Sequence, residues 1–206
     1  MELTPEEVRV LGALVEKQRT TPDQYPLSLN ALRLACNQST NRDPVVEFDE
    51  ATIREALERL ARRRWVRLAS GAGSRATKYR HLLDEALDLS GPETAVLAVL
   101  MLRGPQTPGE LRARTERLHR FDADELRETI DGLAARELVA SIGRRPGQKE
   151  GRYAHLLADG PDTVEAVRAP PSLEERVARL ESEVAELRKT LEQGVHAPDP
   201  PVKPGV

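Results

Sequence analysis

The sequence predicts a mainly helical α+β fold in which a unit of three helices and a β-hairpin occurs twice. Two alignments of the chain with itself predict this duplication. Residues 48–66 align without gaps on residues 121–139, at an offset of 73. Farther along, KYRHLL at 78–83 aligns on RYAHLL at 152–157, at an offset of 74. Because the order of the segments is the same in both halves, we infer that one supersecondary unit is repeated.

The two copies differ in one stretch near their beginnings. VLGAL at 10–14 matches VLAVL at 96–100, at the larger offset of 86. The first copy therefore has about a dozen additional residues before its third helical segment, and most of them belong to CNQSTNRDPVV at 36–46. Its Asn, Gln, Ser and Thr are typical of a loop of caps and turns. They would equally suit a hydrogen-bonding surface beside the third helix.

Capping boxes mark the beginning of the first helix in each copy. Thr4 with Glu7, and Ser90 with Glu93, pair a hydroxyl N-cap with a glutamate three residues later. Apolar residues with the spacing of one helical face follow in both copies: Val8, Leu11, Leu14 and Val15, and then Val96, Leu97, Leu100 and Met101.

The later helices have start signals of the same kind. A second helix is expected from near Ser28 in the first copy and from near Thr107 in the second. Asp49 and Asp122 are the N-cap candidates of the third helix, each preceded by a phenylalanine in hydrophobic-staple position. The expected buried stripes of the third helices are Ile53, Leu57 and Leu60, and Leu126, Ile130 and Leu133.

A β-hairpin is expected after each third helix. Short β-like runs at 65–68 and 138–142 are followed by Gly-containing turns at 71–74 and 143–151, and a second run then ends in Tyr-x-His-Leu-Leu. Three helices and a C-terminal hairpin are the layout of a winged helix, a variant of the helix-turn-helix. A generic α+β unit is the alternative.

The expected organisation is two winged-helix domains, at 1–88 and 89–160, a linker at 161–171, a coiled-coil helix at 172–193 and a disordered Pro-rich tail at 194–206. The coiled coil is predicted from apolar residues at alternating spacings of four and three: Leu173, Val177, Leu180, Val184, Leu187 and Leu191. Val at a and Leu at d favour a parallel homodimer. An amphipathic helix packed on its own domain is the alternative.

Composition narrows the class of protein. No apolar run approaches the ~20 residues that span a bilayer, and the N-terminus lacks the layout of a signal peptide, so we expect a cytoplasmic protein without membrane contact. Lys and Arg balance Asp and Glu at 14 to 14 over residues 1–88 and at 11 to 11 over 89–160. Neither domain is strongly basic, which argues against powerful non-specific binding of nucleic acid.

No residue pattern indicates catalysis, a cofactor or a metal. His81 and His155 occupy equivalent hairpin positions, but neither has a second ligand at useful spacing, so a structural role is the simpler interpretation. The single Cys36 follows an apolar helical stretch and fits a small core residue. Neither a phosphate-binding Gly loop nor a Ser/His/Asp pattern stands out. We therefore expect a protein that is not an enzyme.

The leading functional hypothesis is regulatory binding of double-stranded DNA by the third helix and wing of the first copy, because arginine binds guanine and phosphate bidentately. The expected contacts are Arg54, Arg59, Arg62 and Arg63 from the helix, Arg75 and Lys78 from the wing, and Asn37, Gln38, Asn41 and Arg42 from the additional loop. Glu55 and Glu58 share the helix surface, so a solvated, salt-bridged face is the alternative for it. The competing function is a non-enzymatic protein-interaction scaffold, as tandem winged helices provide in bacterial condensin accessory subunits.

Several long strings resemble one bacterial family. LVEKQRTTPDQYPLSLNALRLACNQSTNRDPV at 14–45, SGAGSRATKY at 70–79, RGPQTPGELRAR at 103–114 and RYAHL at 152–156 are similar to the signature stretches of the YceH-like proteins. The resemblance spans roughly residues 1–157 and implies tandem winged-helix domains in a dimeric cytoplasmic protein. It implies no catalytic or ligand residues, because the family is uncharacterised.

Overall fold

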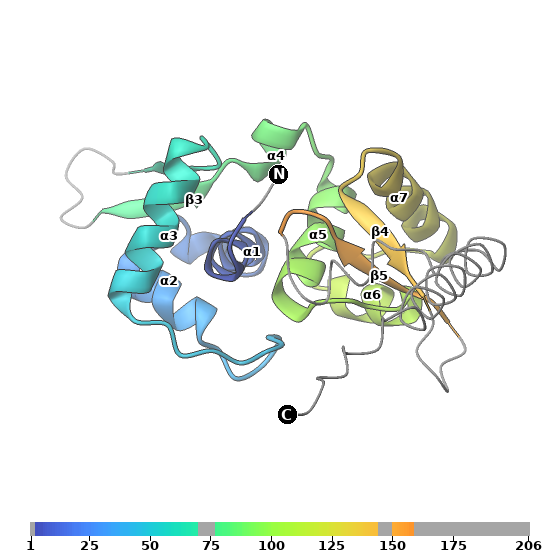
Figure 1. Cartoon of the computed structure of the whole chain (residues 1–206), viewed down its shortest axis with the longest axis horizontal. Helices are drawn as coiled ribbons and strands as arrows, with labels where there is room; N and C mark the ends of the chain where they lie inside the picture. Colours follow the sequence, from blue (N-terminus) through green and yellow to red (C-terminus); the bar gives the residue numbers. More distant parts are fainter. Residues whose placement is uncertain (1–2, 70–76, 144–149, 159–206) are drawn as a thin grey trace, which may run out of the picture. The chain divides into compact units, whose positions relative to one another are not determined.

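The computed structural model describes residues 3–69, 77–143 and 150–158, which all lie in one compact unit, Met1–Arg168. This unit combines α-helices with small antiparallel sheets, so the predicted α+β class is confirmed (Figure 1). None of the helices within the described ranges is long and apolar enough to cross a membrane. The predicted coiled-coil helix and Pro-rich tail lie outside the described residues.

The first half has the element order of a winged helix. Its elements are α1 (Pro5–Thr20), the 3₁₀ turn η1 (Pro22–Gln24), β1 (Leu27–Ser28), α2 (Leu29–Cys36), α3 (Glu50–Arg62), β2 (Val66–Leu68) and β3 (Lys78–His81). The three strands form an antiparallel sheet in the order β1-β3-β2. The hairpin of β2 and β3 is the wing, and β1 closes the sheet on its other side.

The second half repeats this order after a short connecting helix. Its elements are α4 (Leu83–Leu87), α5 (Gly91–Arg103), α6 (Pro108–Thr115), α7 (Ala123–Ala135), β4 (Val139–Ile142) and β5 (Arg152–His155). β4 and β5 pair as an antiparallel hairpin. An isolated bridge between Gln106 and Tyr153 stands where β1 pairs with β3 in the first half. The helical and hairpin segments predicted in the two copies are therefore present.

The predicted caps are confirmed. Thr4 accepts a hydrogen bond from the Glu7 backbone N–H at 3.3 Å, and the Glu7 carboxylate accepts one from the Thr4 N–H at 2.7 Å. Ser90 and Glu93 form the same capping box at the start of α5. Asp49 caps α3 through the Thr52 N–H at 2.8 Å. These bonds satisfy donors that have no partner inside the helix and so fix where each helix begins.

The two third helices end in the same Schellman motif. In α3 the Trp65 N–H donates to the Leu60 carbonyl at 2.9 Å, and the Arg64 N–H donates to the Ala61 carbonyl at 2.9 Å. The second half reproduces both bonds around Glu137. Arg64 and Glu137 have positive φ values of 61° and 55°, a conformation in which glycine is usual. The sequence lacks a glycine at either place and so did not reveal this backbone geometry.

His81 and His155 are buried at equivalent places in the two hairpins. Each Nδ1 accepts a backbone N–H two residues on, from Leu83 at 3.3 Å and from Leu157 at 3.4 Å. The Nε2 of His81 lies 2.6 Å from Gln18 Oε1, so the ring is neutral with its proton on Nε2. Burial lowers the pKa of each histidine to about 4. These contacts support the structural interpretation made from the sequence.

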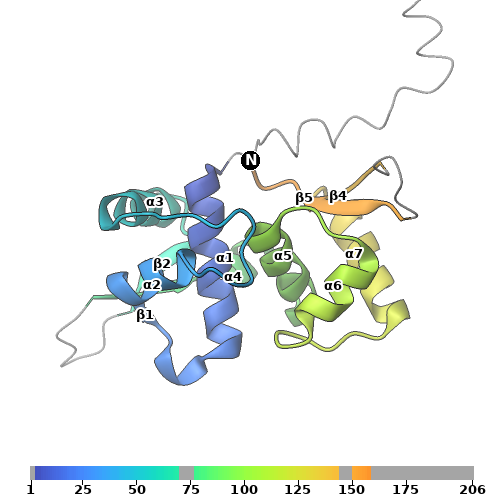
Figure 2. The same ribbon diagram turned by 90° about the horizontal axis from the view of Figure 1, so that it is seen from below.

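The two halves share one hydrophobic core, and α1 packs against α5 at its centre (Figure 2). The helices approach closely at Gly12, where an added Cβ would lie 3.0 Å from Leu102 Cγ and 3.1 Å from Met101 Cβ. The chain ahead of α1 also joins the second half, because the Leu3 N–H donates to the Leu157 carbonyl at 2.9 Å. Division of this unit into domains at residue 88 stays a prediction.

Candidate nucleic-acid interface

The candidate interface consists of α3 and the wing of the first half. Ile53, Leu57 and Leu60 of α3 are buried in the core, as the stripe predicted, so the opposite face of the helix meets solvent. That face is mixed in charge at its centre, where Glu55 and Glu58 are exposed. Arginines are concentrated at the C-terminal end of the helix.

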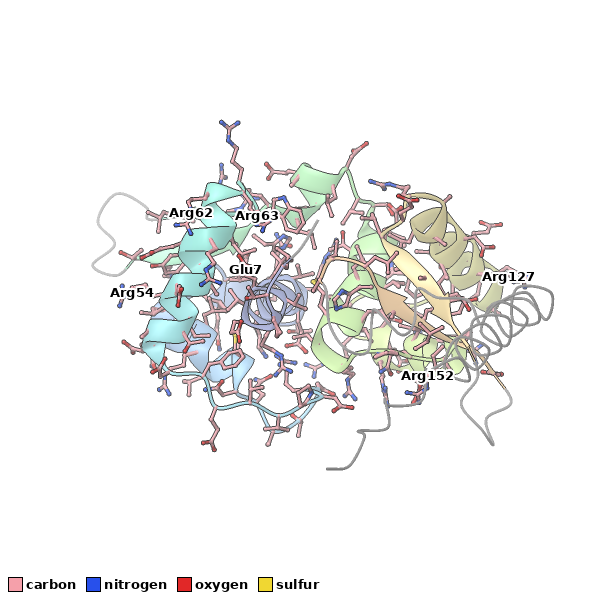
Figure 3. The ribbon with its side chains drawn as sticks, viewed as in Figure 1. Glu7, Arg54, Arg62, Arg63, Arg127 and Arg152 are labelled. Carbon is pink, nitrogen blue, oxygen red and sulfur yellow. The ribbon has the colours of Figure 1, made fainter. Side chains whose placement is uncertain are left out.

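The predicted helix contacts differ in their surroundings (Figure 3). Arg54, Arg62 and Arg63 are exposed. Arg59 is partly exposed and pairs with the Glu55 carboxylate one turn earlier. Because this pair is on the surface, it contributes little stability, and Arg59 can exchange its carboxylate for a phosphate at small cost.

The basic surface continues from the end of α3 onto the wing. Arg64 is exposed in its left-handed position, and Arg67 is exposed on the edge strand β2. Arg67 stands opposite Arg80, whose guanidinium pairs with Glu85 at 2.9 Å. Since side chains alternate along a strand, Arg67, Lys78 and Arg80 share the sheet face that points away from buried Val66. The outer face of the wing is therefore cationic.

Three of the equivalent positions of the second half lack this charge. At the same offset of 73, Arg62, Arg64 and Arg67 correspond to Ala135, Glu137 and Ala140. Arg63 corresponds to Arg136, which is bound to the connecting segment: it donates to the Asp88 and Leu87 carbonyls and pairs with Glu93 at 3.2 Å. One scaffold thus carries three arginines in the first half that have no counterpart in the second, whereas Lys78 corresponds to Arg152.

Arg42, predicted to contact DNA from the additional loop, is instead buried. Its side chain has no exposed surface, and its guanidinium binds the Glu16 carboxylate at 2.6 Å and the Ala35 carbonyl at 2.8 Å. A buried ion pair with its hydrogen bonds completed is costly to break, so Arg42 cannot reach outward for a phosphate. We leave it out of the interface.

The other polar residues of the loop also make internal contacts. The Asn37 amide donates to the Phe48 carbonyl at 2.8 Å and accepts its N–H at 2.9 Å, which fixes the chain just before α3. Gln38 accepts from Arg42 at 3.1 Å. Asn41 accepts from Arg103 of α5. These contacts match the loop of caps and turns, and they connect the two halves through Asn41.

Arg75 lies outside the described residues, and so do the seam residues Leu173, Val177, Leu180, Val184, Leu187 and Leu191. Among the residues that are described, no three His, Cys, Asp or Glu side chains gather in a way that could hold a metal ion. Sequence reasoning left Arg64 and Arg67 outside its set of DNA contacts, although the RRRWVR run from 62 to 67 carries the signal.

The elements and their order define a protein of duplicated winged-helix type, in which Arg62, Arg64 and Arg67 have no basic counterpart in the second copy. The family model described as "Protein of unknown function, DUF480" matches residues 3–148. The chain belongs to this family, so the resemblance seen in the sequence is confirmed.

Relatives match over nearly the whole chain. A "UPF0502 protein" of Serratia proteamaculans (strain 568) is 46% identical over 210 residues, which cover 95% of this chain and 98% of the relative. A "UPF0502 protein" of Klebsiella pneumoniae (strain 342) is also 46% identical, over 95% of this chain and 97% of its own. The "UPF0502 protein YceH" of Salmonella newport (strain SL254) is 45% identical over 93% of this chain and 95% of its own.

Proposed function

We propose that this protein binds double-stranded DNA through a surface that we call the basic end: Arg62, Arg63, Arg64, Arg67 and Lys78. The observation that carries the proposal is the contrast between the two copies. A charge required by the fold would recur at Ala135, Glu137 and Ala140, and it does not. Arg62, Arg64 and Arg67 are therefore not required by the scaffold that the two copies share.

The geometry favours contact with the phosphate backbone. Within the described ranges, Arg62, Arg64 and Arg67 form no ion pair, so their guanidinium groups are available to an anion. Guanidinium binds phosphate through two parallel hydrogen bonds, and wings commonly contact backbone or minor groove. Glu55 and Glu58 would repel phosphates near the middle of α3. Contact is accordingly expected at the C-terminal end of α3 rather than along its whole length.

Fluorescence anisotropy with a labelled DNA duplex at low ionic strength tests the proposal. The variant Arg62→Ala/Arg64→Ala/Arg67→Ala removes three cations of the basic end. The matched control, Arg112→Ala/Arg120→Ala/Arg127→Ala, removes the same charge from exposed positions of the second half. We expect the first variant to bind at least ~10-fold more weakly than the control, because charge-assisted bonds to phosphate are lost. Equal binding by the two variants, or no binding by the wild type, would exclude the basic end as a DNA surface.

A protein-interaction scaffold is the second candidate, and two exposed leucines favour it. Leu34 of α2 and Leu68 of β2 are 56% and 63% exposed. Exposed apolar side chains mark protein-binding surfaces where they form a contiguous patch, and the two leucines are the candidate residues of such a patch. If the wild-type protein fails to bind duplex DNA, replacement of Leu34 and Leu68 by serine in a pull-down from nuclease-treated extract becomes the informative experiment. A partner that survives nuclease and depends on the two leucines would support the scaffold.

A homodimer formed through residues 172–193 belongs to the same proposal. Two half-sites bound by one dimer would strengthen binding, since the second contact becomes intramolecular. The heptad spacing of the sequence supports this part.

A further inference from the structure

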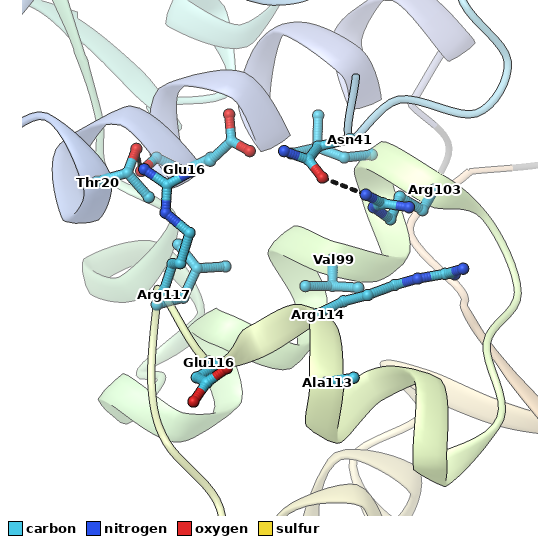
Figure 4. A pocket seen from close by; sticks show the side chains of 11 residues that line it. Glu16, Thr20, Asn41, Val99, Arg103, Ala113, Arg114, Glu116 and Arg117 are labelled. Carbon is cyan, nitrogen blue, oxygen red and sulfur yellow. Dashed lines mark hydrogen bonds between the residues drawn. The ribbon is translucent and has the colours of Figure 1, made fainter.

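A cleft of about 240 Å³ lies beside the packed helices α1 and α5, remote in sequence from the basic end (Figure 4). Glu16 of α1 and Asn41 of the additional loop line one wall. The other walls come from α5, α6 and the residues after α6. Arg103, Arg114 and Arg117 all reach this space, and Val99 and Leu102 supply an apolar floor.

Few described carboxylates lie close enough to neutralise the charges of these three arginines. Arg103 is partly buried, and its guanidinium contacts only the uncharged Asn41 amide among the described residues. No described residue pairs with Arg117. Arg114 reaches Glu110 at the long distance of 3.5 Å, and Glu110 also pairs with Arg152 at 3.4 Å. In Figure 4, Arg117 lies on one side of the opening and Arg103 and Arg114 on the other.

The two acidic residues that line the cleft are already engaged. Glu16 binds the Arg42 guanidinium at 2.6 Å and lies 3.6 Å from Lys17. Glu116 pairs with Arg120 at 3.2 Å. Burial lowers the pKa of Arg103, and the charges of Arg114 and Arg42 lower it further, against the opposing effect of the Glu16 and Asp43 carboxylates. Three guanidinium groups at one cleft, whose two lining carboxylates already pair with other arginines, create a positive potential that an anion would relieve.

We propose that this cleft binds a small phosphate-bearing anion, held by Arg103, Arg114 and Arg117. Guanidinium groups from different elements can bind the oxygens of a tetrahedral phosphate group from two sides. Each guanidinium can donate a pair of hydrogen bonds to these oxygens. The apolar floor would accept a small organic group attached to the phosphate, since such sites combine apolar walls with a few polar anchors. None of these arginines belongs to the basic end, so the inference does not rest on DNA binding.

Isothermal titration calorimetry with sodium pyrophosphate tests the site on the full chain, against sodium chloride at matched ionic strength. We expect saturable binding with one site per chain. Arg117→Gln should weaken it at least about tenfold, since a charge-assisted bond is lost. Arg103→Gln/Arg117→Gln should leave no saturable heat. Arg117→Gln should fold as the wild type does, because the Arg117 side chain is exposed and forms no ion pair with a described residue.

Two controls separate this site from other cations. Arg112 is an exposed arginine of α6 that does not line the cleft. The variant Arg112→Gln should therefore bind pyrophosphate as the wild type does. The triple variant of the basic end should also retain binding. Absence of saturable binding by the wild type would overturn the proposal, and so would equal losses in Arg117→Gln and Arg112→Gln. Loss of binding in the triple variant would place the anion on the DNA surface instead and would likewise overturn it.

Discussion

Arg64 and Glu137 occupy one and the same left-handed position, 73 residues apart, at the ends of equivalent helices. Both residues stand where a Schellman motif favours glycine. The side chain of Arg64 is positively charged and that of Glu137 is negatively charged. A residue other than glycine in this conformation costs roughly 1 kcal/mol. The protein tolerates that cost twice, but only one of the two side chains adds to a basic surface.

The first prediction uses this pair. Arg64→Gly and Glu137→Gly should each raise the free energy of unfolding by roughly 0.5–1 kcal/mol, because glycine adopts positive φ without strain. Only Arg64→Gly should weaken binding to duplex DNA. Urea denaturation and anisotropy measure the two effects. If Arg64→Gly gains stability and binds DNA as well as Glu137→Gly does, Arg64 has no part in the interface.

The second prediction concerns the packing of α1 on α5. Gly12→Ala places a Cβ 3.0 Å from Leu102 Cγ, so the helices must separate slightly. Overpacking costs roughly 1–3 kcal/mol, against roughly 0.5–1 kcal/mol gained by replacing a helical glycine. We expect a net loss of about 1 kcal/mol in urea denaturation.

Gly132→Ala is the matched control for this substitution. Gly132 is also helical, but an added Cβ there meets nothing within 4 Å. This variant should therefore gain the roughly 0.5–1 kcal/mol of helix propensity without a packing cost. Similar gains in both variants would show that α1 and α5 are not closely packed at Gly12.

The third prediction is a pH dependence of stability. Unfolded histidine binds a proton below about pH 6.5, whereas the pKa of folded His155 is lowered to about 4. The unfolded chain therefore holds more protons between these values. The contribution of the buried histidines to the free energy of unfolding should be fully present above pH 6.5. It should decrease as the pH falls toward 4, by up to about 1.4 kcal/mol per pH unit for each buried histidine.

His155→Gln isolates one of the two contributions. Urea denaturation at several pH values should give a shallower slope for this variant than for the wild type between pH 6.5 and 4. Acidic groups that titrate near the lower limit are common to both proteins and cancel in the comparison. Identical slopes would mean that His155 does not stay neutral in the folded protein.

The fourth prediction concerns the heptad seam, which lies outside the described residues. Leu180→Glu/Leu187→Glu introduces charges at d positions, where a parallel coiled coil buries its leucines. We expect the mass measured by light scattering to fall from dimer to monomer. The control Arg179→Glu changes a c position of the predicted heptad and should leave the mass unchanged. A dimer that survives the leucine substitutions would place the interface elsewhere.

Local signals in the sequence predicted most of the fold. The caps at Thr4, Asp49 and Ser90 depend on neighbours three residues away, and the apolar stripes depend on a single helical period, so both can be recognised in one segment. The two-residue strand β1 and the short α4 have no such signal. The left-handed turn at Arg64 went unrecognised because no glycine marks it.

The sites depended on contacts that a linear pattern does not contain. Arg42 is buried because it binds Glu16, 26 residues earlier. The cleft collects Asn41, Arg103 and Arg117 from three separate segments, so their common location appears only in the folded chain. The basic end was partly predictable, since its arginines are close together in sequence and the second copy served as an internal comparison.

The salt dependence of DNA binding tests the central claim most directly. The logarithm of the association constant should fall linearly with the logarithm of salt concentration, with a slope of roughly 0.9 for each phosphate contact. The account predicts that Arg62→Ala/Arg64→Ala/Arg67→Ala lowers this slope by about 2 to 3, while Arg112→Ala/Arg120→Ala/Arg127→Ala leaves it unchanged. A slope that is the same in all three proteins, or a wild type without salt-dependent binding, would contradict it.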